Sequence, residues 1–185
     1  MTEKQLVEAF RVHVERLIQR FNLAVEGLSA DQVNAHPNGV HWGIAEVTEH
    51  MKLALGHYSP VLFQGLETAK PSDGAAGAKQ TFWGKLIEYG SGPRKASPAP
   101  RSLYPAPGPY TVDSLASFEA EHRLILDKLE AAGPVELSAT RVRNPFMKFI
   151  RMNLADMLLV IAAHAERHVG QIEDMAAALK TSSRS

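Results

Sequence analysis

An apolar stripe of helical period runs from Asn153 to Leu179 and is the strongest pattern in the sequence. Its apolar residues recur every three or four positions, which places them on one face of an α-helix. Asn153 and Asp156 have the spacing of an N-terminal cap, so the helix is expected to begin at Asn153. A helix with so long an apolar face needs other helices to cover it. The stripe consists of Leu154, Met157, Leu158, Ile161, His164, Ala165, His168, Ile172, Met175 and Leu179.

Three more segments show the same period and supply helices that can cover this stripe. The first begins at Thr2, where Thr2 and Gln5 have capping-box spacing, and it ends near Gly27. The second covers residues 43–69, and the third covers residues 111–133 and stops at a Gly-Pro pair. Strand signals are weak, and no internal repeat is visible. The sequence therefore predicts an all-α fold, a four-helix bundle with one long crossover.

The length of 185 residues suits one domain, which is predicted over residues 1–180 with a flexible tail at 181–185. Residues 70–110 form the crossover between the second and third helices, and seven of the eleven prolines lie there. A loop of this length is typically functional or disordered. A short amphipathic helix is expected at 80–89. The crossover is either a cover for a site or a simple connector, and the side chains available for a cover are Phe82, Trp83 and Tyr89.

Composition excludes several classes of function. Twenty basic residues balance twenty acidic ones, so no net field draws the chain to nucleic acid or to a membrane surface. No apolar run is long enough to span a bilayer, and the N-terminus lacks the pattern of a signal peptide, so a cytoplasmic location is expected. Cysteine is absent, which excludes disulfides, thiolate ligands and a cysteine nucleophile. Any metal must therefore bind to nitrogen and oxygen ligands, and the chain has eight histidines.

Two histidines of the C-terminal stripe form a candidate metal pair. His164 and His168 are four residues apart, so they share a helix face and can reach one metal ion. The alternative is a polar pair in the core, in which the ring nitrogens need other partners. The pair is not a metalloprotease motif, because Glu166 does not directly follow the first histidine. At about 100° per residue, Glu166 lies on the far side of the helix and is expected to be a solvated charge.

His50 is the candidate for a third ligand. It lies on the stripe of the 43–69 segment, where a bundle brings it opposite the C-terminal helix. Three imidazoles leave coordination positions open, as in catalytic rather than structural sites. The alternative is a histidine satisfied in the core, which is also the expectation for His13 and His122. His57, seven residues further along, is the reserve ligand.

Two motifs resemble the DinB-like superfamily of metal-binding four-helix bundles. The first, from Trp42 to His50, resembles the start of the second helix of that family, with Gly43 where the family usually has serine or threonine. The second comprises Asn144-Pro145-Phe146 and the helix that follows, centred on His164-x-x-Arg167-His168-x-x-Gln171. The resemblance spans most of the chain except the proline-rich crossover.

The resemblance implies a divalent metal ion, zinc or nickel, held by His50, His164 and His168. It also implies that the protein can form a homodimer. It also implies a small-molecule substrate and either transfer of an external low-molecular-weight thiol or metal-dependent hydrolysis. A non-catalytic metal-binding module is the further alternative. No acid or base is evident apart from Glu46, whose other role is in the helix cap. A basic cluster before the last helix is either a solvated stretch or a guide for an anionic substrate, and it comprises Arg141, Arg143, Lys148 and Arg151.

Overall fold

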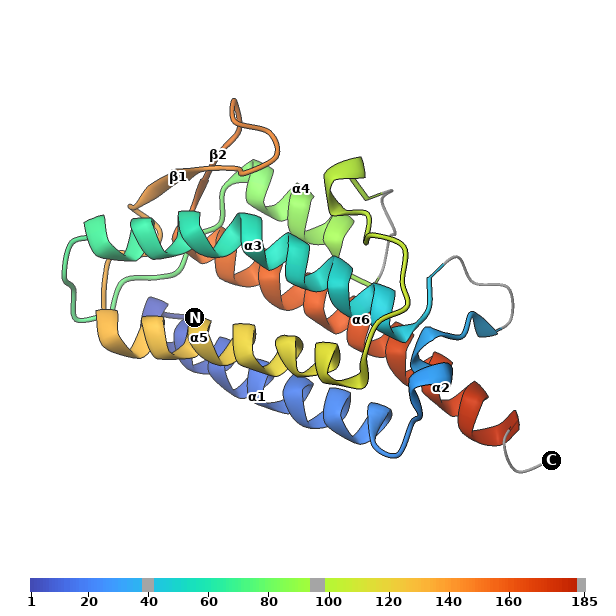
Figure 1. Ribbon diagram of the computed structural model, residues 1–185. Coiled ribbons are helices and arrows are strands. Elements are labelled where there is room, and N and C mark those ends of the chain that lie inside the picture. The colour runs from blue at the N-terminus through green and yellow to red at the C-terminus, as the bar shows by residue number, and fades with distance from the viewer. Residues whose placement is uncertain (38–41, 94–98, 183–185) are drawn as a thin grey trace.

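The computed structural model describes residues 1–37, 42–93 and 99–182, and most of them are helical. Helix α6 packs against α1 and α3, and α5 packs against the same two helices (Figure 1). Helices α1 and α6 run in one direction, and α3 and α5 run in the other. Within the described part of the chain, no helix has the length and apolar character needed to cross a bilayer. The long helices are α1 (Glu3–Val25), α3 (Ile44–Thr68), α5 (Ala116–Ala132) and α6 (Leu154–Ser182).

The predicted helix starts are confirmed by reciprocal hydrogen bonds. At α1, the Thr2 side chain accepts from the Gln5 amide, and the Gln5 side chain accepts from the Thr2 amide. At α6, the Asp156 amide donates to Asn153 Oδ1 at 2.8 Å, and the Asn153 amide donates to Asp156 Oδ2 at 3.0 Å. Each pair satisfies amides that have no carbonyl partner within the first turn. These caps fix where α1 and α6 begin.

The core lies where the apolar faces of the four long helices meet. Phe21 of α1 stacks on Phe118 of α5 with their ring centroids 4.3 Å apart, which joins these two helices. His122 of α5 is buried in the same region, as the sequence predicted. Burial of each large apolar side chain contributes roughly 1.5–3 kcal/mol. The largest fully buried side chains are Phe21, Leu17, Ile44, Met51, Leu62, Ile125, Leu137, Met152, Leu154, Met157, Leu158 and Ile172.

The smaller elements lie mainly in the connections. Helix α4 and the β hairpin lie on the other side of α3 and α6 from α1 and α5 (Figure 1). The two strands are antiparallel, with Val142 paired with Met152. Strands of only three residues leave no clear pattern in the sequence. Residues 94–98 of the expected crossover and 183–185 of the expected tail lie outside the described residues. The elements are α2 (Ala30–Asn34), α4 (Phe82–Ser91), η2 (Arg101–Leu103), η3 (Val112–Leu115), β1 (Arg141–Arg143) and β2 (Arg151–Asn153).

A buried carboxylate ties α4 to the first turn of α6. Asp156 accepts hydrogen bonds from the Thr81 amide at 3.0 Å and from the Thr81 hydroxyl at 2.7 Å. The same hydroxyl accepts from the Gly84 amide and so caps α4. A β-carbon at Gly84 would overlap the Asp156 carboxylate, so only glycine permits this approach. The contact holds α4 against the helix that carries His164 and His168.

Candidate metal centre

Helices α3 and α6 bring the three predicted histidines together. His50 lies in the second turn of α3, and His164 and His168 lie one turn apart in the middle of α6. The two helices are antiparallel and pack against each other, so the three imidazoles meet in their interface. One ring nitrogen from each histidine lies within 4.8 Å of the corresponding nitrogens of the other two. His50 and His168 are only 3% and 4% exposed.

Hydrogen bonds to Nδ1 orient two of the three rings. His50 Nδ1 lies 2.8 Å from the carbonyl oxygen of Leu103, and His168 Nδ1 lies 2.7 Å from Gln171 Oε1. These oxygens only accept, so both Nδ1 atoms carry the proton. In a neutral ring the Nε2 atom then presents a lone pair. This is the arrangement by which neighbouring groups fix the tautomer and orientation of histidine ligands.

The contact between His50 and His164 tests whether a metal fits. The two Nε2 atoms are 3.2 Å apart. Because His50 Nε2 has no proton in the neutral ring, the contact requires either a proton on His164 Nε2 or a cation shared between the rings. Among the described residues, no carboxylate belongs to this group of possible ligands. Three convergent imidazole nitrogens could therefore hold a divalent metal ion.

Burial keeps all three rings in the neutral form that binds metal. It lowers the pKa of His168 to about 3, with further lowering by the charges of His50 and Arg167. Burial also lowers the pKa of His50, against the opposing effect of the Leu103 carbonyl. The pKa of His164 is well below its ordinary value, because of burial first and then the neighbouring positive charges. Since protons compete with metals for imidazole nitrogen, a low pKa favours metal binding near neutral pH.

The histidines open into a cavity of about 870 Å³. Trp42 lies against His50 with ring centroids 5.0 Å apart, and Tyr104 meets Trp42 edge to face. Asn144 Oδ1 accepts from the Phe146 and Met147 amides, and this turn shapes another part of the wall. The remaining lining residues are mostly apolar and comprise Ala54, Leu55, Tyr58, Trp83, Leu86, Ile87, Gly90, Ser91, Ala99, Pro100, Leu103, Ile150, Val160, Ile161 and Arg167.

Part of the expected crossover thus lines the cavity, although not with all the expected side chains. Trp83 belongs to the lining, while Phe82 is 73% exposed and does not. Tyr89 is also exposed and outside the lining. The Leu103 carbonyl was missed as a functional group because a backbone acceptor leaves no trace in residue type. Gln171 was already part of the motif, but its contact with His168 depends on helix geometry.

Two other candidates lie outside the metal centre. His57 is exposed on α3, with its ring centroid 4.9 Å from that of Phe146, so its expected place on the buried stripe was wrong. Glu46 accepts from the Gly43 amide at 2.8 Å and lies 2.8 Å from His36 Nε2. It therefore has the capping role, and it is not among the possible metal ligands.

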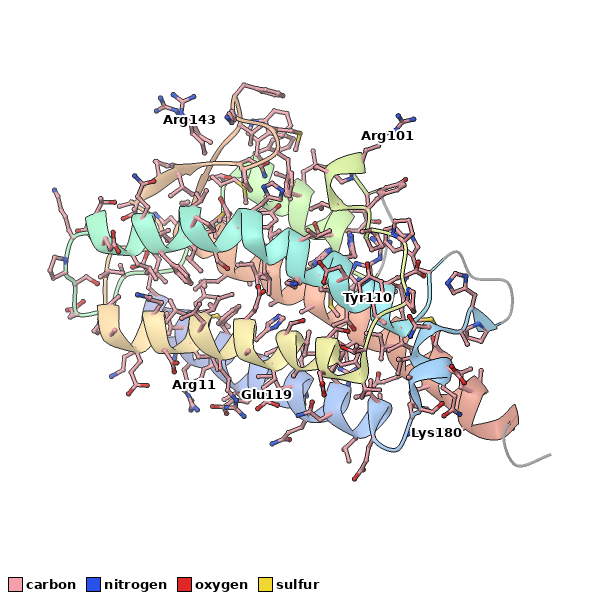
Figure 2. The ribbon with its side chains drawn as sticks, viewed as in Figure 1. Arg11, Arg101, Tyr110, Glu119, Arg143 and Lys180 are labelled. Atoms are coloured by element: carbon pink, nitrogen blue, oxygen red, sulfur yellow. The ribbon has the colours of Figure 1, made fainter. Side chains whose placement is uncertain are left out.

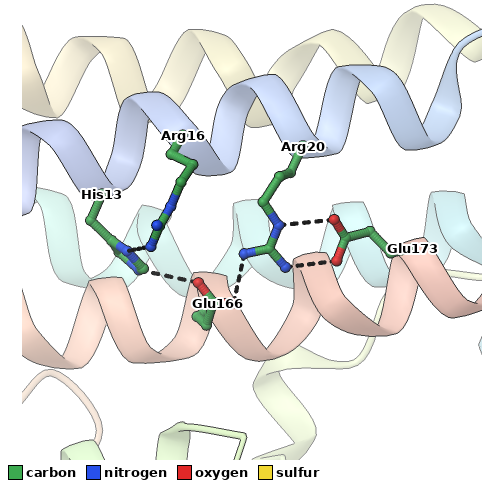
Figure 3. A network of polar contacts seen from close by, with 5 residues as sticks. All are labelled: His13, Arg16, Arg20, Glu166 and Glu173. Carbon is green, nitrogen blue, oxygen red and sulfur yellow. Dashed lines mark hydrogen bonds and ion pairs between the residues drawn. The ribbon is translucent and has the colours of Figure 1, made fainter.

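Glu166 was expected to be a solvated charge, and this was wrong. It lies partly buried between α6 and α1, where Arg20 Nη1 donates to it at 2.7 Å (Figure 3). Arg20 also donates to Glu173 from Nε and Nη2, at 2.9 and 2.6 Å. His13 Nε2 is 3.4 Å from the other Glu166 oxygen. The periodicity correctly placed Glu166 away from the histidines, but that side of α6 faces α1 rather than solvent.

The comparisons with known proteins agree with the motif resemblance. The family model of the DinB superfamily matches residues 13–172, a span that includes all three histidines. No curated protein and no solved structure matches the chain. The match covers well over half of the sequence, and it confirms the family expected from the Trp42–His50 and C-terminal helix motifs. The chain therefore belongs to the DinB superfamily.

Proposed function

We propose that the protein is a DinB-type four-helix bundle that binds one zinc or nickel ion through His50, His164 and His168. We further propose that it uses this ion to transfer a low-molecular-weight thiol to a small-molecule substrate. The observation that supports the proposal is the convergence of three neutral imidazoles on one wall of a mainly apolar cavity. The homodimer and the cytoplasmic location expected from the sequence stay predictions.

The ligand set supports catalysis rather than a purely structural metal. Among the described residues, only three side chains converge, whereas structural sites usually supply four. The chain has no cysteine, so the thiol must come from outside the protein. When bound, a divalent metal lowers the pKa of a thiol or of water. The histidines would hold it, and the apolar wall would exclude bulk water and bind the apolar part of the substrate.

Thiol transfer is favoured over hydrolysis by the composition of the cavity wall. In the part of the chain that the structure describes, no aspartate or glutamate lines the cavity. Attack by water usually needs a side chain that accepts a proton, whereas a thiol already ionised near neutral pH needs none. Metal-dependent hydrolysis is therefore the alternative, and a non-catalytic module is disfavoured by a cavity of about 870 Å³ at the histidines.

One experiment tests both parts of the proposal. The protein is purified without an affinity tag, its zinc and nickel are measured by elemental analysis, and a cobalt-loaded sample is titrated with small thiols. Changing His50, His164 or His168 to alanine should lower metal affinity at least ~100-fold, since even changes behind the ligands cost 10–100-fold. Added thiol should produce a new near-ultraviolet absorption band with the wild-type protein.

His57→Ala is the matched control, because His57 is an exposed histidine of the same helix. It should bind metal as the wild type does. Equal losses in His50→Ala and His57→Ala would show that the ligand assignment is wrong. Normal metal binding without any spectral response to thiols would exclude thiol transfer and leave hydrolysis or a structural metal.

A further inference from the structure

Among the described residues that line the cavity, Arg167 is the only one with a permanently charged side chain. The other described lining residues, apart from the three histidines, are apolar or uncharged, and none of them is acidic. Arg167 is partly buried, and this burial lowers its pKa. An arginine stays charged in proteins nonetheless. The cavity therefore has a fixed positive charge within a mostly apolar wall.

No acidic side chain in the described part of the chain forms an ion pair with Arg167. Other arginines do have such partners, for example Arg20 with Glu166 and Arg123 with Glu119. The segments 38–41, 94–98 and 183–185 contain no aspartate or glutamate. A partly buried cation without a counter-charge is costly unless a ligand or water compensates it. A bound anion would supply the missing partner.

The position of Arg167 connects this charge to the histidines. It is three residues from His164 on α6, so the two side chains share a helix face. It also precedes His168 directly, and it lines the same cavity as all three histidines. An anionic group on Arg167 would therefore be held beside the proposed metal.

We propose that Arg167 determines the substrate class by binding the carboxylate of an amphipathic organic anion. A guanidinium presents parallel donors that match the two oxygens of a carboxylate. The apolar body of the ligand lies against the α4 wall formed by Trp83, Leu86 and Ile87. A volume of about 870 Å³ is in the range of small-molecule sites. This inference deepens the proposed function, on which its catalytic meaning rests, but the binding itself needs no metal.

The two tryptophans of the chain provide a direct test. Trp42 and Trp83 are the only tryptophans in the sequence, and both line the cavity. Their fluorescence reports occupancy in metal-free protein. Octanoate is compared with octanamide, which has the same chain and no charge. We expect saturable binding of octanoate, roughly ten- to a hundredfold tighter than that of octanamide, from a hydrogen-bonded charge pair.

Three variants separate a specific contact from general charge. Arg167→Gln should bring octanoate binding down to the level of octanamide, and Arg167→Lys should restore part of the preference, because it keeps the charge without the paired donors. Arg143→Gln is the control. Arg143 is exposed, projects from the hairpin away from the helices (Figure 2), and is not part of the lining. It should bind octanoate as the wild type does.

Equal affinity of the wild type for octanoate and octanamide would overturn the proposal. Retention of the carboxylate preference in Arg167→Gln would overturn it too, as would the same loss in Arg143→Gln. Circular dichroism of each variant establishes that it is folded. Because the titrations use metal-free protein, their failure would leave metal binding by the histidines intact, and a failure of metal binding would leave these titrations interpretable.

Discussion

Burial gives the histidines of this protein different roles by controlling which nitrogens find partners. His122 is 1% exposed, its Nδ1 donates to the Phe118 carbonyl at 2.7 Å, and its Nε2 has no partner among the described residues. Burial lowers the pKa of His122 to about 4. His50 and His168 are nearly as buried, but their rings lie against other imidazoles of the cluster. Only the latter arrangement could hold a metal.

His122 should make the fold sensitive to acid. Its pKa is about 4 in the native state against an ordinary 6.5, so the unfolded chain takes up the proton first as the pH falls. The free energy of unfolding should therefore decrease as the pH falls from 6.5 to 4. The expected decrease is about 3 kcal/mol, at roughly 1.4 kcal/mol per unit of pKa difference. His122→Leu removes this loss. Urea unfolding of metal-free wild type and variant at both pH values measures the difference, and an identical loss in both proteins would contradict it.

At the scale of elements, features set by residues close in sequence were predictable, and features set by contacts between distant segments were not. The starts of α1 and α6 followed from capping residues within four positions of each other. His50 and His57 differ by only about 20° around an ideal helix, so periodicity could not separate them. They differ in what lies beside each of them on α3. His50 is buried against the α6 histidines, whereas His57 is exposed and has the Phe146 ring beside it.

The attachment of α4 should depend on the absence of a side chain at Gly84. Alanine usually stabilises a helix interior by about 1 kcal/mol relative to glycine. In Gly84→Ala the new β-carbon would overlap the buried Asp156 carboxylate, so we expect a net destabilisation of about 1–3 kcal/mol. Hydrogen exchange of the α4 amides should rise, while exchange in α1 stays slow. Chemical denaturation and exchange measured by mass spectrometry give both values.

Gly56 of α3 provides the matched control for this substitution. A β-carbon there meets no atom within 4 Å, so Gly56→Ala should be neutral or stabilising by up to about 1 kcal/mol. If both variants were equally stable, the contact between Gly84 and Asp156 would not be what positions α4.

At the scale of the whole molecule, the candidate site borders the core and shares apolar side chains such as Leu55 and Ile161 with it, while the histidines are additional to the core. The core joins all four long helices through apolar side chains, and Arg20 adds a polar link between α1 and α6. The histidines add a link between α3 and α6 only. The sequence predicted the helices and the ligands, because both follow from helical period. It predicted only part of the cavity wall, because Trp83 was a candidate cover from the crossover, whereas Met147 and Ile150 come from a hairpin without a clear pattern.

A core that does not depend on the three histidines predicts how the protein responds to loss of metal. Zinc that binds only the native state at a hundred times its dissociation constant adds about 2.7 kcal/mol, or roughly 5–10 °C in melting temperature for a chain of this size. Metal-free protein should melt that much lower and keep its helical circular dichroism, since the apolar core packs without using the three histidines. His50→Ala should melt at one temperature with or without zinc, whereas His57→Ala should keep the full shift. An apo form without helical signal would show instead that the metal is needed to fold the chain, and a full shift in His50→Ala would place the zinc elsewhere.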